Sequence, residues 1–127
     1  MSSLKILYVD DEPDIREVAT FALELDPEIE VATADSGGLA LSMLDRGAVL
    51  PDLFLLDVMM PDLDGPMTLA QIRQRPAFAA IPAVFITARA QPHERDHLLG
   101  LGAIGVVTKP FDPMTLAGDI RALMTRE

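Results

Sequence analysis

The stretch DLFLLDVMMP, from Asp52 to Pro61, has the pattern of a buried β-strand that carries a single carboxylate, Asp57, near its end. A short, continuous apolar run bounded by turn-forming residues is typical of a strand in a parallel sheet that is covered on both faces. Burying an ionised carboxylate without partners is costly, so such a group usually becomes neutral or finds a cation. Asp57 therefore either leaves the core where the strand ends or is held there by another group.

Similar apolar runs recur along the chain and alternate with segments of helical periodicity. The segment 14–25, for example, follows Pro13 and places its apolar residues on one helical face. That face consists of Ile15, Val18, Ala19, Ala22 and Leu25. The predicted strands are 5–10, 28–34, 53–60, 83–88 and 103–108, and the predicted helices are 14–25, 36–47, one that Pro76 ends, about 93–100, and a last one that carries Leu116, Ile120, Leu123 and Met124. This alternation predicts a doubly wound α/β fold with a five-stranded parallel sheet and helices on both faces.

The composition of the 127 residues predicts one domain, 1–127, with a substantial hydrophobic core. The absence of cysteine excludes disulfides, thiolate zinc sites and cysteine nucleophiles. The apolar runs are too short to span a membrane and the N-terminus is unlike a signal peptide, so we expect a cytoplasmic protein. The net charge of −10 opposes binding to nucleic acid or to an anionic membrane surface, and favours a divalent cation or a basic partner.

The residues at the predicted strand ends suggest a binding site. In doubly wound sheets, ligands bind beyond the carboxyl ends of the strands. The first predicted strand ends in Asp10 and Asp11 and the third carries Asp57, so these acids converge if the two strands are neighbours. Three carboxylates that close repel one another by roughly a few kcal/mol per pair at an effective dielectric of about 20. A hard cation such as Mg²⁺ binds this set of oxygen ligands and offsets the repulsion.

Thr87 and Lys109, at the ends of the fourth and fifth predicted strands, add a hydroxyl and a positive charge. Both groups suit the oxygens of a phosphoryl group. A nucleophilic aspartate, a metal ion and such donors are together the parts needed for phosphoryl transfer onto a carboxylate.

Four motifs, ILYVDDE, PDLFLLDVMMPDLDG, VFITA and KPF, resemble in order and position the receiver domain of two-component response regulators. They extend from the first predicted strand to the last. The resemblance implies a flavodoxin-like strand order of 2-1-3-4-5. It also implies that a phosphohistidine on a sensor histidine kinase or a phosphotransfer protein donates a phosphoryl group to Asp57, and that the product switches contacts with a downstream protein target.

The resemblance also implies roles for individual residues. Asp10, Asp11 and Asp57, with the backbone carbonyl of Met59, would bind Mg²⁺, with Mn²⁺ as an alternative ion. Thr87 and Lys109 would contact the phosphoryl oxygens, and the Lys109–Pro110 peptide bond would be cis. Such a protein is not an enzyme in the usual sense, because it catalyses only its own phosphorylation and dephosphorylation.

This chain departs from the family pattern at one position. Receivers commonly carry tyrosine or phenylalanine three residues before the lysine, where this chain has Val106. An aromatic side chain that swings inward is therefore not available as a switch. Met59 and Arg89 occupy positions that, in the family, influence how fast the phosphoryl group is lost.

Several alternatives remain open from the sequence. Asp11 or Glu12 has a simpler possible role as the cap of the first helix, because both precede Pro13. The segment HERDH, His93 to His97, matches the H-E-x-x-H pattern of zinc peptidases, although no further histidine supplies a third ligand. A flavin-type ligand at the switch point is a further alternative, but the first loop is acidic where a phosphate cradle needs small residues.

The extent of the protein is the last open point. Only MTRE follows the last predicted helix, so we expect a single-domain receiver that works through protein contacts. A receiver cut from a longer regulator with an output domain is the alternative.

Overall fold

A computed structural model describes residues 3–125 of the chain and confirms the predicted doubly wound α/β fold. All strand pairs are parallel, and the strand order is 2-1-3-4-5, as the family resemblance implied. The elements follow in the order β1 (Leu4–Val9), α1 (Pro13–Leu23), β2 (Ile29–Ala34), α2 (Gly37–Asp45), β3 (Leu53–Asp57), α3 (Gly65–Arg73), β4 (Ala83–Thr87), α4 (Pro92–Gly100), β5 (Gly105–Thr108) and α5 (Leu116–Thr125).

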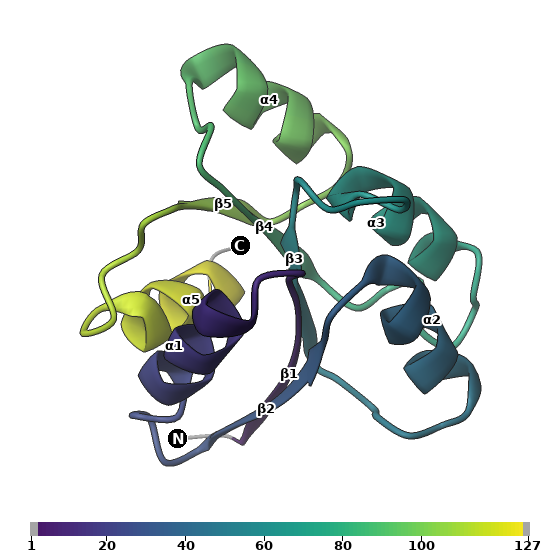
Figure 1. Cartoon of the computed structure of the whole chain (residues 1–127), viewed down its shortest axis with the longest axis horizontal. Helices are drawn as coiled ribbons and strands as arrows, with labels where there is room; N and C mark the ends of the chain where they lie inside the picture. Colours follow the sequence, from purple (N-terminus) through teal and green to yellow (C-terminus); the bar gives the residue numbers. More distant parts are fainter. Residues whose placement is uncertain (1–2, 126–127) are drawn as a thin grey trace.

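Helices cover both faces of the sheet (Figure 1). Helices α1 and α5 pack on one face, where Ala22 and Ile120 belong to one buried cluster. Helices α2, α3 and α4 cover the other face, where Leu44, Ile72 and Leu98 belong to a second cluster. No helix within residues 3–125 is long and apolar enough to cross a membrane.

Strand β3 lies in the middle of the sheet and contributes to both clusters. Leu53 and Leu55 face the α1 and α5 side, whereas Phe54 and Leu56 face the α2 to α4 side. All five of its residues are buried, including Asp57 at its end. The continuous apolar run therefore arises because side chains that alternate between two faces of the strand are buried on both.

Several predicted boundaries differ from the structure by two or three residues, among them the end of α2 at Asp45 and the start of β5 at Gly105, and the ends of α1 and β3 show why. Helix α1 ends at Leu23 and not at Leu25, because Pro27 disfavours helical geometry in the residue before it. The predicted apolar face is also partly wrong, because Leu23 is buried, whereas Val18 and Leu25 are 42 % and 47 % exposed. Strand β3 ends at Asp57 and not at residue 60, because the chain turns back and the Gly65 N–H bonds to the Val58 carbonyl at 3.0 Å.

The turn after β3 requires glycine at position 65. A Cβ atom there would lie 2.5 Å from the carbonyl oxygen of Asp57 and 3.0 Å from Cα of Val58. Asp64 caps helix α3, because its side chain accepts a hydrogen bond from the Met67 N–H at 2.8 Å. The start of α3 is thus packed directly on the backbone that positions Asp57.

We expect Gly65→Ala to destabilise the protein by about 1–3 kcal/mol, because backbone atoms of β3 must move to admit the methyl group. Gly118→Ala is the matched control, since a Cβ atom at this exposed position in α5 meets nothing within 4 Å. That variant should be neutral or more stable by up to about 1 kcal/mol, because alanine favours a helix over glycine. Urea unfolding measures both, and equal effects at the two positions would contradict this account.

Candidate functional site

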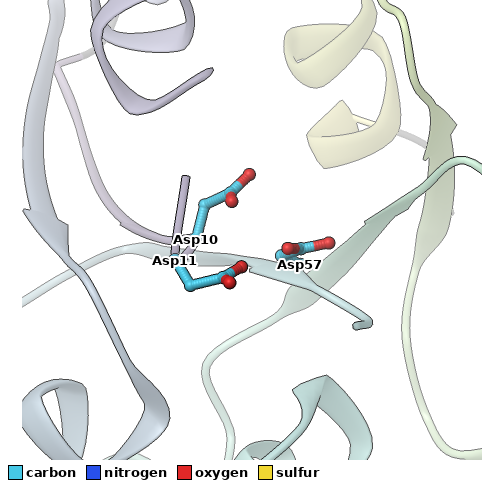
Figure 2. Close-up of side chains that lie close together, drawn as sticks. All are labelled: Asp10, Asp11 and Asp57. Carbon is cyan, nitrogen blue, oxygen red and sulfur yellow. The ribbon is translucent and has the colours of Figure 1, made fainter. Parts of the chain in front are cut away.

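The carboxyl ends of β1 and β3 bring three carboxylates together. The two strands are neighbours, and Val9 pairs with Leu56. Asp10 and Asp57, which directly follow these two residues, therefore lie beside one another. Asp11 follows Asp10 at the same edge of the sheet (Figure 2). One carboxylate oxygen from each of the three acids lies within 4.8 Å of the others.

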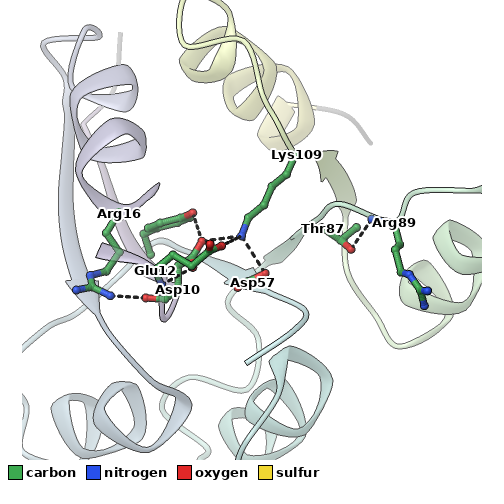
Figure 3. Close-up of polar contacts among 8 residues, drawn as sticks. Asp10, Glu12, Arg16, Asp57, Thr87, Arg89 and Lys109 are labelled. Atoms are coloured by element: carbon green, nitrogen blue, oxygen red, sulfur yellow. Dashed lines mark hydrogen bonds and ion pairs between the residues drawn. The ribbon is translucent and has the colours of Figure 1, made fainter. Parts of the chain in front are cut away.

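Lys109 reaches into this cluster from the end of β5 (Figure 3). Its ammonium nitrogen Nζ lies 3.0 Å from Oδ2 of Asp10 and 3.3 Å from Oδ1 of Asp57. A third carboxylate, that of Glu12, lies 3.4 Å away. The Lys109–Pro110 peptide bond is cis, as the family resemblance implied.

Asp10 is fully buried, and hydrogen bonds satisfy both of its carboxylate oxygens. The hydroxyl of Tyr8 donates to Oδ2 at 2.7 Å, and the backbone N–H of Glu12 donates to Oδ1 at 3.0 Å. Burial, and then the hydrogen bond to Asp10, raise the pKa of Tyr8 far above its usual value, so the phenol stays neutral and remains a donor. Arg16 donates to the backbone carbonyl of Asp10 at 2.7 Å and ties α1 to the end of β1.

Asp57 is the acid whose ionisation is most affected by this environment. Burial and, after it, the charge of Asp10 raise the pKa of Asp57 to about 7, although Lys109 acts in the opposite direction. Burial also opposes the charge of Lys109, but the hydrogen bonds and charges of Asp10 and Asp57 outweigh burial and raise the pKa of the ammonium. The site therefore holds more negative charge than Lys109 alone balances.

The donor set fits a metal ion. Carboxylate oxygens that converge at one sheet edge are the ligands that hard divalent cations prefer. Such an ion would also reduce the repulsion among Asp10, Asp11 and Asp57. Met59 lies in the loop two residues after Asp57, at the same edge of the sheet, and its carbonyl remains a predicted ligand.

Thr87 ends β4 and is buried, but its hydroxyl accepts a hydrogen bond from the backbone N–H of Arg89 at 3.0 Å. Its carbonyl accepts the N–H of Lys109 at 2.8 Å, which ties the ends of β4 and β5 together. The side chain of Arg89 is 75 % exposed and pairs with Glu94 of α4 at 4.0 Å. In Figure 3 Thr87 and Arg89 accordingly lie to one side of the carboxylate cluster.

Sequence reasoning did not identify the roles of Tyr8 and Glu12 in this site. Tyr8 lies within an apolar run, but it precedes Asp10 by two residues, so the alternation of side chains along a strand could have indicated the contact. The sequence suggests Glu12 as a helix cap. In the structure it occupies the N-cap position of α1, but its side chain makes no capping hydrogen bond. Its contact with Lys109 joins residues 97 positions apart, so no local pattern reveals it.

The HERDH segment forms the first turns of α4, with both histidines exposed. In the part of the chain that the structure describes, the group of side chains with metal-binding geometry is Asp10, Asp11 and Asp57. The structure therefore gives the zinc-peptidase alternative no support. It offers no phosphate cradle for a flavin after β1 either, because acidic residues occupy that loop.

The raised pKa of Asp57 predicts a pH-dependent stability. A carboxyl group whose pKa rises on folding binds more protons in the folded chain, so the free energy of unfolding falls as the pH increases from about 4 to about 7. Asp57→Asn removes this loss. Without metal ions, the variant should gain stability relative to the native chain across this interval and keep a constant advantage at higher pH. Urea unfolding with a chelator present measures the difference, with Asp14→Asn as an exposed control; a difference that does not change with pH would contradict the prediction.

Comparisons with known proteins agree with this geometry. A family model described as the response regulator receiver domain matches residues 6–121. An uncharacterized 14.6 kDa protein of Leptolyngbya boryana is 38 % identical over 116 residues, which cover 91 % of this chain and 86 % of that protein. The transcriptional regulatory protein CseB of Streptomyces coelicolor is 40 % identical over 124 residues, which cover 95 % of this chain and 49 % of CseB.

A solved structure supports the same assignment. The chemotaxis response regulator CheY4 of Vibrio cholerae superposes with a TM-score of 0.84 at 29 % sequence identity, covering 96 % of this chain and 99 % of that one. Both the family model and the fold therefore extend over nearly all of the described residues. The chain belongs to the response regulator receiver domain family of two-component systems.

Proposed function

We propose that Asp57 accepts a phosphoryl group from a phosphohistidine of a sensor histidine kinase or a phosphotransfer protein. The observation that carries this proposal is the position of Asp57. It lies at the carboxyl edge of the sheet, 3.3 Å from the ammonium of Lys109 and beside Asp10 and Asp11. Family membership supports the class of donor, because response regulators work with histidine kinases.

The transfer exchanges one bond for another. A carboxylate oxygen of Asp57 attacks phosphorus as the P–N bond to the donor histidine breaks, and the released imidazole nitrogen keeps the electron pair and takes a proton from solvent. The negative charge on the phosphoryl oxygens then needs donors nearby. Lys109 supplies an ammonium, and Thr87 supplies a hydroxyl from the next strand.

We further propose Mg²⁺ as the ion of this site, held by Asp10, Asp11, Asp57 and the Met59 carbonyl, with Mn²⁺ as a substitute. When bound, the ion would neutralise charge on the phosphoryl oxygens and on the carboxylates around them. The chain's own contribution is the fixed placement of the acids. Asp10 is held by Tyr8 and by the Glu12 N–H, so its carboxylate does not rotate freely.

The product would act as a switch through contacts with another protein. The Thr87 hydroxyl accepts the Arg89 N–H and keeps its own proton to donate to a phosphoryl oxygen, so a movement of Thr87 toward that oxygen would pull on the loop that leads to α4. The domain would catalyse only its own phosphorylation and dephosphorylation. We propose a single-domain receiver in the cytoplasm, and the support for one domain is that this chain covers 86 % of the Leptolyngbya boryana relative. A receiver of a longer regulator is the alternative, because this chain covers 49 % of CseB.

Incubation with acetyl phosphate should add one phosphoryl group to the native chain in the presence of Mg²⁺. Asp57→Asn should gain none, because an amide is not a nucleophile for this transfer. Lys109→Ala should fold but be phosphorylated slowly or not detectably, because the phosphoryl oxygens lose their charged donor. Intact-mass spectrometry measures the product.

Two controls make the mass experiment decisive. A chelator in place of Mg²⁺ should abolish the addition, and hydroxylamine should remove the group, as it does for an acyl phosphate and not for a phosphate ester. Addition that persists in Asp57→Asn, or no addition to the native chain from either acetyl phosphate or a phosphohistidine donor, would overturn the proposed function.

The valine at position 106 predicts a modest response on the face formed by α4, β5 and α5. Val106 is 7 % exposed and packs in the cluster with Phe85 and Leu98, so there is no aromatic ring that moves between exposed and buried positions. Amide chemical shifts of the phosphorylated chain should change mainly in the loops after β1, β3 and β4. Asp57→Asn treated in the same way is the control, and large changes confined to α4, β5 and α5 would contradict this expectation.

A further inference from the structure

Glu12 occupies the N-cap position of helix α1 but does not use its side chain as a cap. Aspartate at this position usually accepts a hydrogen bond from a backbone N–H of the first helical turn, whereas glutamate is not among the favoured N-cap residues. The Glu12 side chain makes no such bond. Its Oε1 instead lies 3.4 Å from Nζ of Lys109, as Figure 3 shows. The Glu12 side chain therefore contacts Lys109 of the site and not the backbone of the helix.

The three carboxylates around Lys109 differ strongly in exposure. An ammonium has three N–H donors, and Asp10, Asp57 and Glu12 lie 3.0, 3.3 and 3.4 Å from Nζ. The Asp10 and Asp57 side chains are 0 % and 5 % exposed, whereas that of Glu12 is 60 % exposed. Water screens an exposed ion pair and makes it weak. Glu12 is therefore the partner that Lys109 leaves at the lowest cost in free energy.

A phosphoryl group on Asp57 supplies a stronger partner for the same ammonium. Its oxygens carry close to two negative charges and would lie inside the site, where charge-assisted hydrogen bonds are stronger than at the surface. Because Nζ of Lys109 already lies within 3.4 Å of three carboxylates, a phosphoryl oxygen would compete with them for its three donors. We propose that Glu12 is a positioning residue that holds Lys109 in the unphosphorylated chain and is exchanged for a phosphoryl oxygen. This inference rests on the proposed function.

Two variants separate the contact from its charge. Glu12→Gln keeps the length of the side chain and removes the charge, whereas Glu12→Asp keeps the charge but is one methylene too short to preserve the contact. Asp14→Asn is the matched control, because Asp14 is an exposed acid in the first turn of the same helix. If the contact itself matters, the two Glu12 variants should behave alike and differ from Asp14→Asn.

The sequence provides a direct spectroscopic readout of the contact. Lys5 and Lys109 are its two lysines, so a sample labelled with ¹³C-lysine gives two ε-methylene signals in an NMR spectrum. Before phosphorylation, both Glu12 variants should shift the Lys109 signal and leave the Lys5 signal in place, whereas Asp14→Asn should shift neither. After phosphorylation by acetyl phosphate and Mg²⁺, the Lys109 signals of the native chain and of the Glu12 variants should coincide.

The rate of phosphorylation supplies a second readout. At saturating Mg²⁺, Glu12→Gln should be phosphorylated roughly two- to fivefold faster than the native chain, the range expected when one exposed ion pair is released. Its affinity for Mg²⁺ should fall, because one anion near the ion is lost. General damage to the site would instead lower the rate and the Mg²⁺ affinity together, and that result would contradict a positioning role.

The outcomes distinguish this inference from the proposed function. If the native chain is not phosphorylated at all, the proposed function fails, while the shift of the Lys109 signal before phosphorylation still tests the contact. If the native chain is phosphorylated but Glu12→Gln leaves the Lys109 signal unmoved, or the signals still differ after phosphorylation, the inference about Glu12 is wrong and the proposed function stands.

Discussion

The contact of the Lys109 ammonium with Asp10 and Asp57 is the interaction on which the rest of the site depends. Two carboxylates buried side by side, at the adjacent ends of β1 and β3, repel each other strongly unless a cation lies near both. Lys109 crosses from the end of β5 to meet both, at 3.0 and 3.3 Å. Because desolvation offsets much of the attraction in such a buried group of charges, its value lies in placing the side chains more than in stabilising the fold.

The fold contributes rigidity to this charged edge. Strand β3 is buried on both faces, and its partner strands β1 and β4 fix the position of its last residue. The turn that follows is closed by Gly65, which packs on the carbonyl of Asp57. Asp57 therefore has little freedom to move away from Asp10, and the excess negative charge persists. A rigid, partly desolvated carboxylate with a raised pKa and a neighbouring ammonium is well suited to accept a phosphoryl group.

The valine at position 106 limits how a structural change at the site could reach the surface. Val106 is packed in the core where family members commonly carry an aromatic residue, so no ring is available to follow Thr87. One connection from the site to the surface runs through the loop after β4. The Thr87 hydroxyl accepts the Arg89 N–H, and the Arg89 side chain pairs with Glu94 on α4. A movement of Thr87 would thus be felt first at the start of α4.

The sequence by itself determined the fold class and the main members of the site. Apolar runs alternating with helical periodicity were sufficient to predict a parallel sheet, and acids, a threonine and a lysine at strand ends indicated the edge where they gather. The ends of elements were less predictable, as the exposed Leu25 and the early end of β3 show. They depend on proline geometry and on hydrogen bonds that close loops.

Only the tertiary structure decided how the side chains of the site share their contacts. In the structure the Tyr8 hydroxyl donates to Asp10, the Thr87 hydroxyl accepts the Arg89 N–H, and the Glu12 side chain contacts Lys109 instead of capping α1. The contact between Glu12 and Lys109 joins residues 97 positions apart. The contacts of Tyr8 and Thr87 are local, each joining residues two positions apart, but the sequence does not say which of several available partners each hydroxyl takes. The sheet decides which strand ends are neighbours through strand order and register, which no local pattern in the sequence encodes.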